Sequence, residues 1–165
     1  MPLPPAPPSA RSSLPAATQS ASKCRNRTGH MARILLAKLG TDAHDNGITV
    51  VAEWLRRDGH EVTYSGLYVT PEQVAELALE TAADVVGVSY LASEPVYLTA
   101  RLLERLAEKG LEDMPVVVGG VVTPTSTKRL RDLGIEGIFP PGSRRQAILD
   151  GVAAALAGEG RNIPG

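Results

Sequence analysis

From residue 31 onward, the sequence predicts an α/β protein in which a parallel sheet carries helices on both faces. Two observations lead to this fold class. Short apolar runs alternate with amphipathic stretches, in βα units of about 25 residues. In addition, three of the runs are almost continuously apolar, which is typical of strands that are buried on both faces of a parallel sheet.

The predicted strands are short, rich in β-branched residues and bounded by Gly, Pro or Asp. In chain order they are RILLAK (33–38), EVTYSG (61–66), DVVGVSYL (84–91), MPVVVGG (114–120) and EGIFP (136–140).

Helical spacing predicts the first two helices. Residues 47–57 place their apolar side chains on one face, and Trp54 is expected in the core rather than as a binding platform. The second helix begins after Thr70, which is an N-cap residue followed by Pro71 and an acidic first turn.

The other three helices follow the same logic. The third covers residues 97–109 and is closed by Gly110 as its C′ residue. Thr123 and Pro124 open the fourth. The fifth is expected to be capped by Ser143 and to run through Leu156.

These elements give a (βα)5 chain, for which the expected fold is the flavodoxin-like (Rossmann-type) doubly wound five-stranded sheet with strand order 2-1-3-4-5. Ligands of such sheets bind beyond the carboxyl ends of the strands, near the switch point between strands 1 and 3. The loops to inspect are therefore 39–47, 89–95, 119–124 and 139–143.

The composition divides the chain of 165 residues at about residue 30. Residues 1–30 hold six of the thirteen prolines and no Asp or Glu, so they are interpreted as a disordered tail, and residues 31–160 as the folded domain. Met31 as the true start, or an organelle transit peptide, are the alternatives for the tail. A net charge of −1, one cysteine and no long apolar run indicate no nucleic-acid or membrane partner and favour a cytoplasmic protein.

The loop after the first strand reads GTDAHDNG and places His44 at the predicted ligand edge. Asp42, two residues earlier, can accept a hydrogen bond from one ring nitrogen and leave the other nitrogen for a metal. One histidine without cysteine cannot form a closed zinc site. If His44 binds a metal, other ligands must supply most of the coordination, and a tetrapyrrole-like macrocycle would do so.

The other loops at this edge add small and polar residues. Ser89 ends the third strand and could hydrogen-bond a ligand. Gly119 and Gly120 follow three valines and would let a ligand approach the backbone, and a simple turn is the alternative interpretation. The last loop, FPPGS (139–143), is a rigid turn before a helix.

Together these motifs resemble the cobalamin-binding domain of the methylmalonyl-CoA mutase family, over residues 32 to 157. The family's D-x-H-x-x-G appears as residues 42–47, its S-x-L as residues 89–91, and its G-G as residues 119–120. The flanking AKLG, TPEQ, GGVVTP and PPGS resemble the mutase version of the domain. Ala43 and Asn46 depart from the usual DGHDRG, and Ser93-Glu94-Pro95 replaces a Gly-Gly-His stretch.

The resemblance implies a role for each matched residue. His44 would replace the cofactor's own base as the lower axial ligand of cobalt. Asp42 would orient the ring of His44, and Lys38 would pair with Asp42. Asp45 and Gly47 complete the motif. The displaced nucleotide tail of adenosylcobalamin would enter a pocket between sheet and helices, and the residues implied to line it are Ser89, Leu91, Gly119, Gly120, Phe139, Gly142 and Ser143.

The resemblance also implies an activity. The chain is too short to include a (β/α)8 barrel of about 250 residues. It would therefore be the small subunit of an adenosylcobalamin-dependent acyl-CoA mutase, inactive alone, whose partner is a large TIM-barrel subunit that binds the acyl-CoA. The alternatives are a non-catalytic corrinoid carrier for methyl transfer, a B12-linked sensor or chaperone, and a flavodoxin-like domain without cobalamin.

Overall fold

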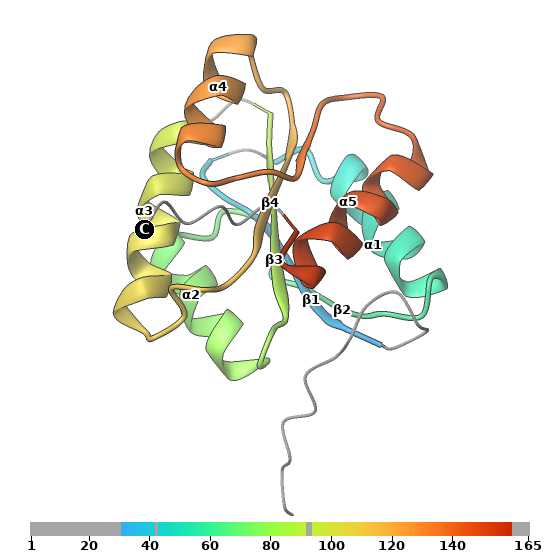
Figure 1. Cartoon of the computed structure of the whole chain (residues 1–165), viewed down its shortest axis with the longest axis horizontal. Coiled ribbons are helices and arrows are strands. Elements are labelled where there is room, and N and C mark those ends of the chain that lie inside the picture. The colour runs from blue at the N-terminus through green and yellow to red at the C-terminus, as the bar shows by residue number, and fades with distance from the viewer. Residues whose placement is uncertain (1–30, 42, 92–93, 160–165) are drawn as a thin grey trace, which may run out of the picture.

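The computed structural model describes residues 31–41, 43–91 and 94–159, and the predicted tail, residues 1–30, lies outside this range. Five parallel strands form one sheet in the order β2-β1-β3-β4-β5 (Figure 1). The strands are β1 (Arg33–Lys38), β2 (Glu61–Tyr64), β3 (Val85–Tyr90), β4 (Val116–Gly120) and β5 (Ile138–Phe139). The predicted fold class and strand order are confirmed.

Helices cover both faces of the sheet. The helices are α1 (Asn46–Arg57), α2 (Pro71–Glu80), α3 (Pro95–Glu108), α4 (Pro124–Asp132) and α5 (Arg145–Ala157). One face carries α2, α3 and α4, and the other face carries α1 and α5 (Figure 1). No helix in the described part of the chain is both long and apolar enough to cross a membrane.

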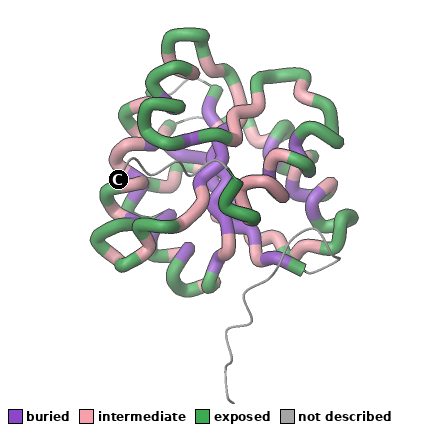
Figure 2. Tube along the Cα trace, in the orientation of Figure 1, coloured by how far each residue is buried: buried purple, intermediate pink, exposed green. Residues whose placement is uncertain are grey.

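The core is divided by the sheet because successive side chains of a strand point to opposite faces. In β1, Leu35 and Ala37 pack with α2, α3 and α4, whereas Ile34 and Leu36 pack with α1 and α5. Figure 2 shows the buried residues concentrated along the central strands, with exposed residues on the outer surfaces of the helices. The near-continuous apolar runs of the sequence thus supply two separate cores.

Several predicted boundaries differ from the structure by one or two residues. Helix α3 begins at Pro95, two residues before the predicted start, because proline is accommodated in the first turn of a helix. Ser143 does not cap the last helix, so that prediction was wrong. Its hydroxyl donates instead to the carbonyl of Pro140 at 2.6 Å and closes the preceding turn, and Arg144 takes the N-cap position.

The predicted start of α2 is correct and forms a complete capping box. The hydroxyl of Thr70 accepts from the backbone N–H of Gln73 at 3.2 Å, and the side chain of Gln73 accepts from the N–H of Thr70 at 2.9 Å. Both bonds satisfy donors at the helix start that have no partner within the helix.

We expect Thr70→Ala to lower the free energy of unfolding by about 1 kcal/mol, because one helix donor loses its acceptor. Urea unfolding of the purified protein measures this change. Gln73→Ala removes only the reciprocal bond and should cost less than Thr70→Ala. A larger loss for Gln73→Ala would show that the capping box does not stabilise α2 in this way.

Candidate functional site

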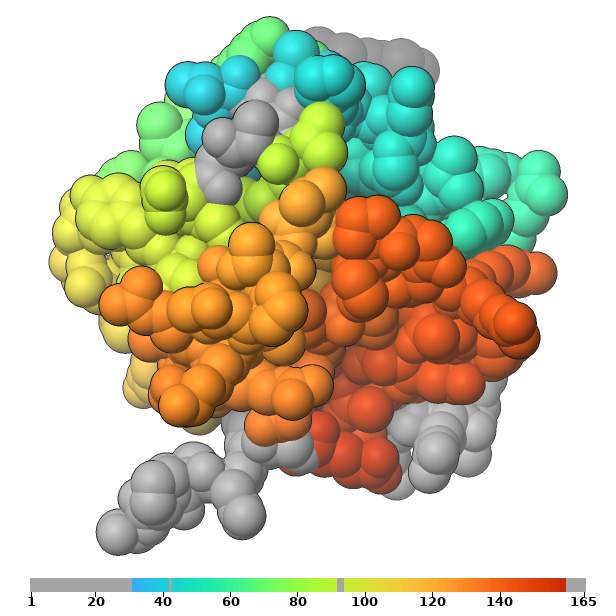
Figure 3. Space-filling view, turned by 90° about the horizontal axis from the view of Figure 1, so that it is seen from above, coloured from blue at the N-terminus to red at the C-terminus, as the bar shows by residue number. Residues whose placement is uncertain are grey.

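The carboxyl ends of the strands form the upper edge of the sheet, where the connecting loops meet. Seen from above, the segments that follow β1, β3, β4 and β5 come together on one face (Figure 3). A cavity of about 670 Å³ lies here, between the sheet and the pair α1 and α5. This volume is in the range of small-molecule and cofactor sites.

The structure brings most of the sequence-predicted site residues to this one cavity. Ten of them line it: Lys38, His44, Gly47, Ser89, Leu91, Gly119, Gly120, Phe139, Gly142 and Ser143. Asp45 does not line the cavity, although it lies between His44 and α1. Asp42 lies outside the described residues, so its predicted contacts with His44 and Lys38 stay predictions.

The deep part of the cavity is apolar. Its floor is the sheet, through side chains such as Ile34, Leu36 and Val117, and its walls are the inner faces of α1 and α5. Residues from these helices include Ile48, Val51, Trp54, Leu55, Ile148 and Val152. Such an interior suits a largely apolar group rather than a highly charged one.

Polar residues gather where the strands end. Lys38 is the last residue of β1, is only 2% exposed, and pairs in register with Ser89 of β3. His44 is exposed in the loop just before α1, and Asn46 and Gly47 open that helix. The start of α5 also lies at the cavity, through Gly142 and Ser143. Two helix N-termini, which favour anionic groups, therefore flank the polar end of the cavity.

The adjacent glycines at the end of β4 serve different purposes. A Cβ on Gly119 would lie 3.7 Å from the nearest atom, the carbonyl oxygen of Phe139, which is an ordinary contact. A Cβ on Gly120 would lie 1.8 Å from the carbonyl oxygen of Tyr90, and Gly120 has φ +103°. Gly120 is thus required by the packing of β4 on β3, whereas Gly119 leaves room beside the cavity.

Another glycine lets α5 approach the sheet closely. A Cβ on Gly151 of α5 would lie 2.5 Å from the ring of Phe139. The ring of Phe139 therefore packs directly on the α5 backbone and forms part of the cavity wall. Because of this contact, β5 holds the ring of Phe139 in place at the cavity although the strand has only two residues.

Sequence reasoning missed the residues that form the floor and walls of the cavity. Gly87 lies within β3, and a Cβ there would meet the side chain of Leu36 at 2.6 Å. A glycine inside a strand often marks a close approach, and this signal was present in the sequence. Trp54 was predicted to be core only, but it is half-buried and lines the cavity as well as packing on the α1–α5 side.

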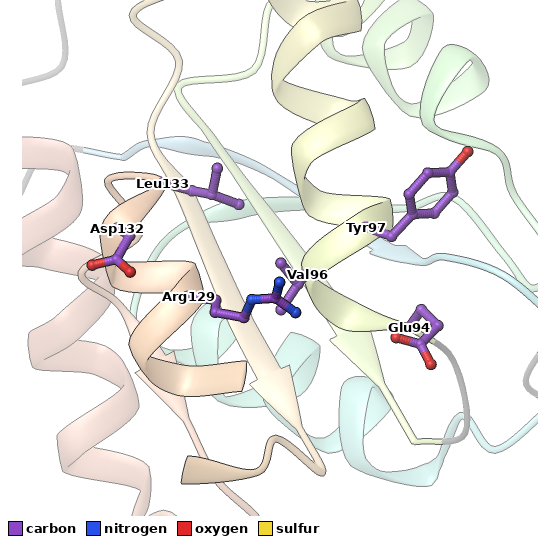
Figure 4. A pocket seen from close by; sticks show the side chains of 6 residues that line it. All are labelled: Glu94, Val96, Tyr97, Arg129, Asp132 and Leu133. Atoms are coloured by element: carbon purple, nitrogen blue, oxygen red, sulfur yellow. The ribbon is translucent and has the colours of Figure 1, made fainter. Parts of the chain in front are cut away.

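A second, smaller hollow lies between α3 and α4. Its volume is about 380 Å³, and Figure 4 shows the residues that line it: Glu94, Val96, Tyr97, Arg129, Asp132 and Leu133. The ring of Tyr97 points away from α4 in this view. None of the predicted site residues contributes to this hollow. Among the described residues, no three His, Cys, Asp or Glu side chains are grouped as a metal site.

Comparison with known proteins identifies the family. The family model described as "B12 binding domain" matches residues 32–150, and so it covers the loop with His44 and all of the cavity lining except Val152. The chain belongs to the B12-binding domain family.

Several relatives of this B12-binding domain are acyl-CoA mutases or their subunits. The 2-hydroxyisobutanoyl-CoA mutase small subunit of Aquincola tertiaricarbonis is 38% identical over 128 residues, which cover 78% of this chain and 94% of that subunit. The methylmalonyl-CoA mutase large subunit of Streptomyces virginiae is 41% identical over 115 residues, or 70% of this chain. The chain spans only 16% of that large subunit. The predicted resemblance is confirmed.

Solved structures support the fold. A cobalamin-binding protein from Desulfitobacterium hafniense superposes with a TM-score of 0.62 at 22% identity, over 74% of this chain and 59% of that one. A response regulator from Chloroflexus aurantiacus gives a TM-score of 0.60 at 15% identity, over 77% and 98% of the two chains. At these identities only the fold is shared. The B12-binding domain has Ser89 near the end of β3, where a phosphoacceptor receiver would need an aspartate.

Proposed function

We propose that this chain is the cobalamin-carrying small subunit of an adenosylcobalamin-dependent acyl-CoA mutase, with residues 31–160 as its cobalamin-binding domain. The main support for the proposal is the cavity, because ten of the site residues predicted from the sequence line it. The near full-length similarity to a mutase small subunit supports the same role. A cytoplasmic location is proposed with it, on the basis of a chain with a single cysteine.

The cavity fits the nucleotide tail of a cobalamin in the base-off form. Its apolar interior, between the sheet and α1 and α5, can hold the flat aromatic base of the tail. The polar end offers the N-termini of two helices to the phosphate of the tail. Gly87 and Gly119 keep the cavity open beside the backbone of β3 and β4.

His44 is proposed as the lower axial cobalt ligand, because it lines the cavity at its polar end, in an exposed loop. Asp42 is proposed to orient its ring, and Lys38 to hold Asp42 from the end of β1. Adenosylcobalamin, when bound, supplies the radical chemistry of the carbon-skeleton rearrangement. The residues of this chain would bind the tail and present the imidazole, and the partner subunit would bind the substrate.

The partner proposed is a large TIM-barrel subunit that binds the acyl-CoA. Exposed large apolar side chains support a docking surface at the carboxyl edge, since Tyr68, Leu91, Tyr97 and Val121 are all 40–63% exposed and all follow strand ends or open a helix there. Apolar patches of this kind mark protein interfaces. A barrel seated on this edge would cover the cofactor and exclude water from the reaction.

The function is tested by adding adenosylcobalamin to the purified chain and recording its visible spectrum after desalting. We expect the cofactor to be retained in a base-off form. Mixing the loaded chain with the large subunit of a relative should then give one complex on gel filtration and mutase activity. Free base-on cofactor that separates from the protein would contradict the proposal. Retention of methylcobalamin in preference to adenosylcobalamin would support the corrinoid carrier instead.

A further inference from the structure

The hydroxyl of Tyr64 is buried and has no hydrogen-bond partner among the described residues. Tyr64 is the last residue of β2, and its backbone is fixed by pairing in register with Leu36 of β1. A buried hydroxyl without a partner lowers the stability of the folded state, and native proteins contain few of them. Its presence here points to a partner that another state of the protein supplies.

Asp45 lies at the same edge of the sheet as Tyr64, because α1 begins at the edge where the parallel strands end. Burial raises the pKa of Tyr64, and the negative charge of Asp45 raises that pKa further. Asp45 occupies the N-cap position of α1, but its side chain makes no capping bond. Its carboxylate forms no hydrogen bond or ion pair with any residue that the structure describes. A carboxylate and a buried hydroxyl, both without a described partner, therefore lie at the same edge of the sheet and on its α1 side.

The pair lies at the loop that carries His44. Asp45 follows His44 directly and its carbonyl oxygen accepts from the N–H of Thr49, so the position of Asp45 sets the start of α1. Tyr64 belongs to the rigid sheet and packs on the α1–α5 side of the core. A bond between the two would connect the loop to the sheet, one residue from the proposed cobalt ligand.

We propose that Tyr64 is a positioning residue for His44: when cobalamin is bound, the Tyr64 hydroxyl donates a hydrogen bond to the Asp45 carboxylate and fixes the loop that presents the imidazole. The inference rests on the proposed function. A hydrogen bond to a carboxylate is charge-assisted and stronger than a neutral one. Because the bond is absent without cofactor and present with it, it favours the bound state specifically.

The test is Tyr64→Phe, which keeps the ring and removes only the hydroxyl. Without cobalamin, we expect its melting temperature to equal or exceed that of the wild type, because an unsatisfied polar atom is removed. The dissociation constant for adenosylcobalamin should rise by about 10-fold, as expected for one lost charge-assisted bond. At saturating cofactor, the absorption of the His-on form should also fall.

A double-mutant cycle with Asp45→Asn assigns the effect to the pair, because the two losses of affinity should not add. Additive losses would overturn the proposal. So would a Tyr64→Phe protein that melts several degrees lower without cobalamin, since the hydroxyl would then serve the cofactor-free fold. If the wild type retains cobalamin and Tyr64→Phe binds it equally well, only this inference fails. If the wild type does not bind cobalamin, the proposed function fails with it.

Discussion

His44→Ala should abolish the His-on absorption of bound adenosylcobalamin and weaken cofactor binding by about 100-fold, or about 2.7 kcal/mol. The imidazole is the proposed axial ligand, and alanine offers no atom that can bind cobalt. The melting temperature without cofactor should stay within about a degree, because His44 is exposed in a loop and surface changes seldom exceed 0.5 kcal/mol. Free imidazole added to the variant should restore part of the His-on spectrum.

His60→Ala is the matched control for this prediction. His60 lies before β2, at the opposite edge of the sheet, and its Nδ1 accepts from the N–H of Ala32 at 3.2 Å. Its loss should lower the free energy of unfolding by about 1 kcal/mol and leave the cobalamin spectrum unchanged. If His60→Ala and His44→Ala reduced cofactor binding equally, His44 would not be the cobalt ligand.

Gly120→Ala should be the most destabilising single change at the site, by at least about 4 kcal/mol. The added methyl would lie 1.8 Å from the carbonyl oxygen of Tyr90, so the backbones of β3 and β4 must move apart. The residue also has φ +103°, which L-residues rarely adopt. A cost of this size is a large part of the 5–15 kcal/mol that typically stabilises a domain. Guanidinium unfolding, or loss of soluble protein, measures it.

Gly119→Ala, at the adjacent position, should behave in the opposite way. Its Cβ would meet only the Phe139 carbonyl at 3.7 Å, so we expect the free energy of unfolding to change by less than about 1 kcal/mol. The methyl would nevertheless stand beside the cavity and should weaken cobalamin binding. Equal stability of the two variants would contradict the distinction between a packing glycine and a site glycine.

The fold could be predicted because hydrophobic pattern and turn chemistry agree along the part of the chain that the structure describes. Parallel strands buried on both faces leave a clear apolar signal, and Thr70 and Thr123 mark helix starts that the structure reproduces. Ser143 failed as a cap because its hydroxyl can also close a turn, and the sequence does not distinguish these two uses.

The candidate site could be predicted only in part, for a similar reason. Loop residues such as His44 and Ser89 were found because parallel strands bring their carboxyl ends to one edge. The residues of the cavity walls were missed. Helical spacing predicts that α1 has an apolar face with Trp54 and Leu55, but it does not predict that a cavity separates this face from the sheet. That separation depends on side chains that meet only in three dimensions.

Because the sheet divides the core into two, we expect the two helical layers to unfold locally at different free energies. The layer of α2 and α3 packs on the sheet, and the ion pairs Arg101–Glu72 and Arg105–Glu72 join the two helices. The layer of α1 and α5 instead encloses the large cavity. Local stability follows buried apolar contact, so the amides of α1 and α5 should exchange with solvent deuterium before those of α2 and α3. A bound nucleotide tail would fill the cavity under α1 and α5 and slow the exchange of their amides. The vitamin would then act as a part of the hydrophobic core that is added after the chain has folded.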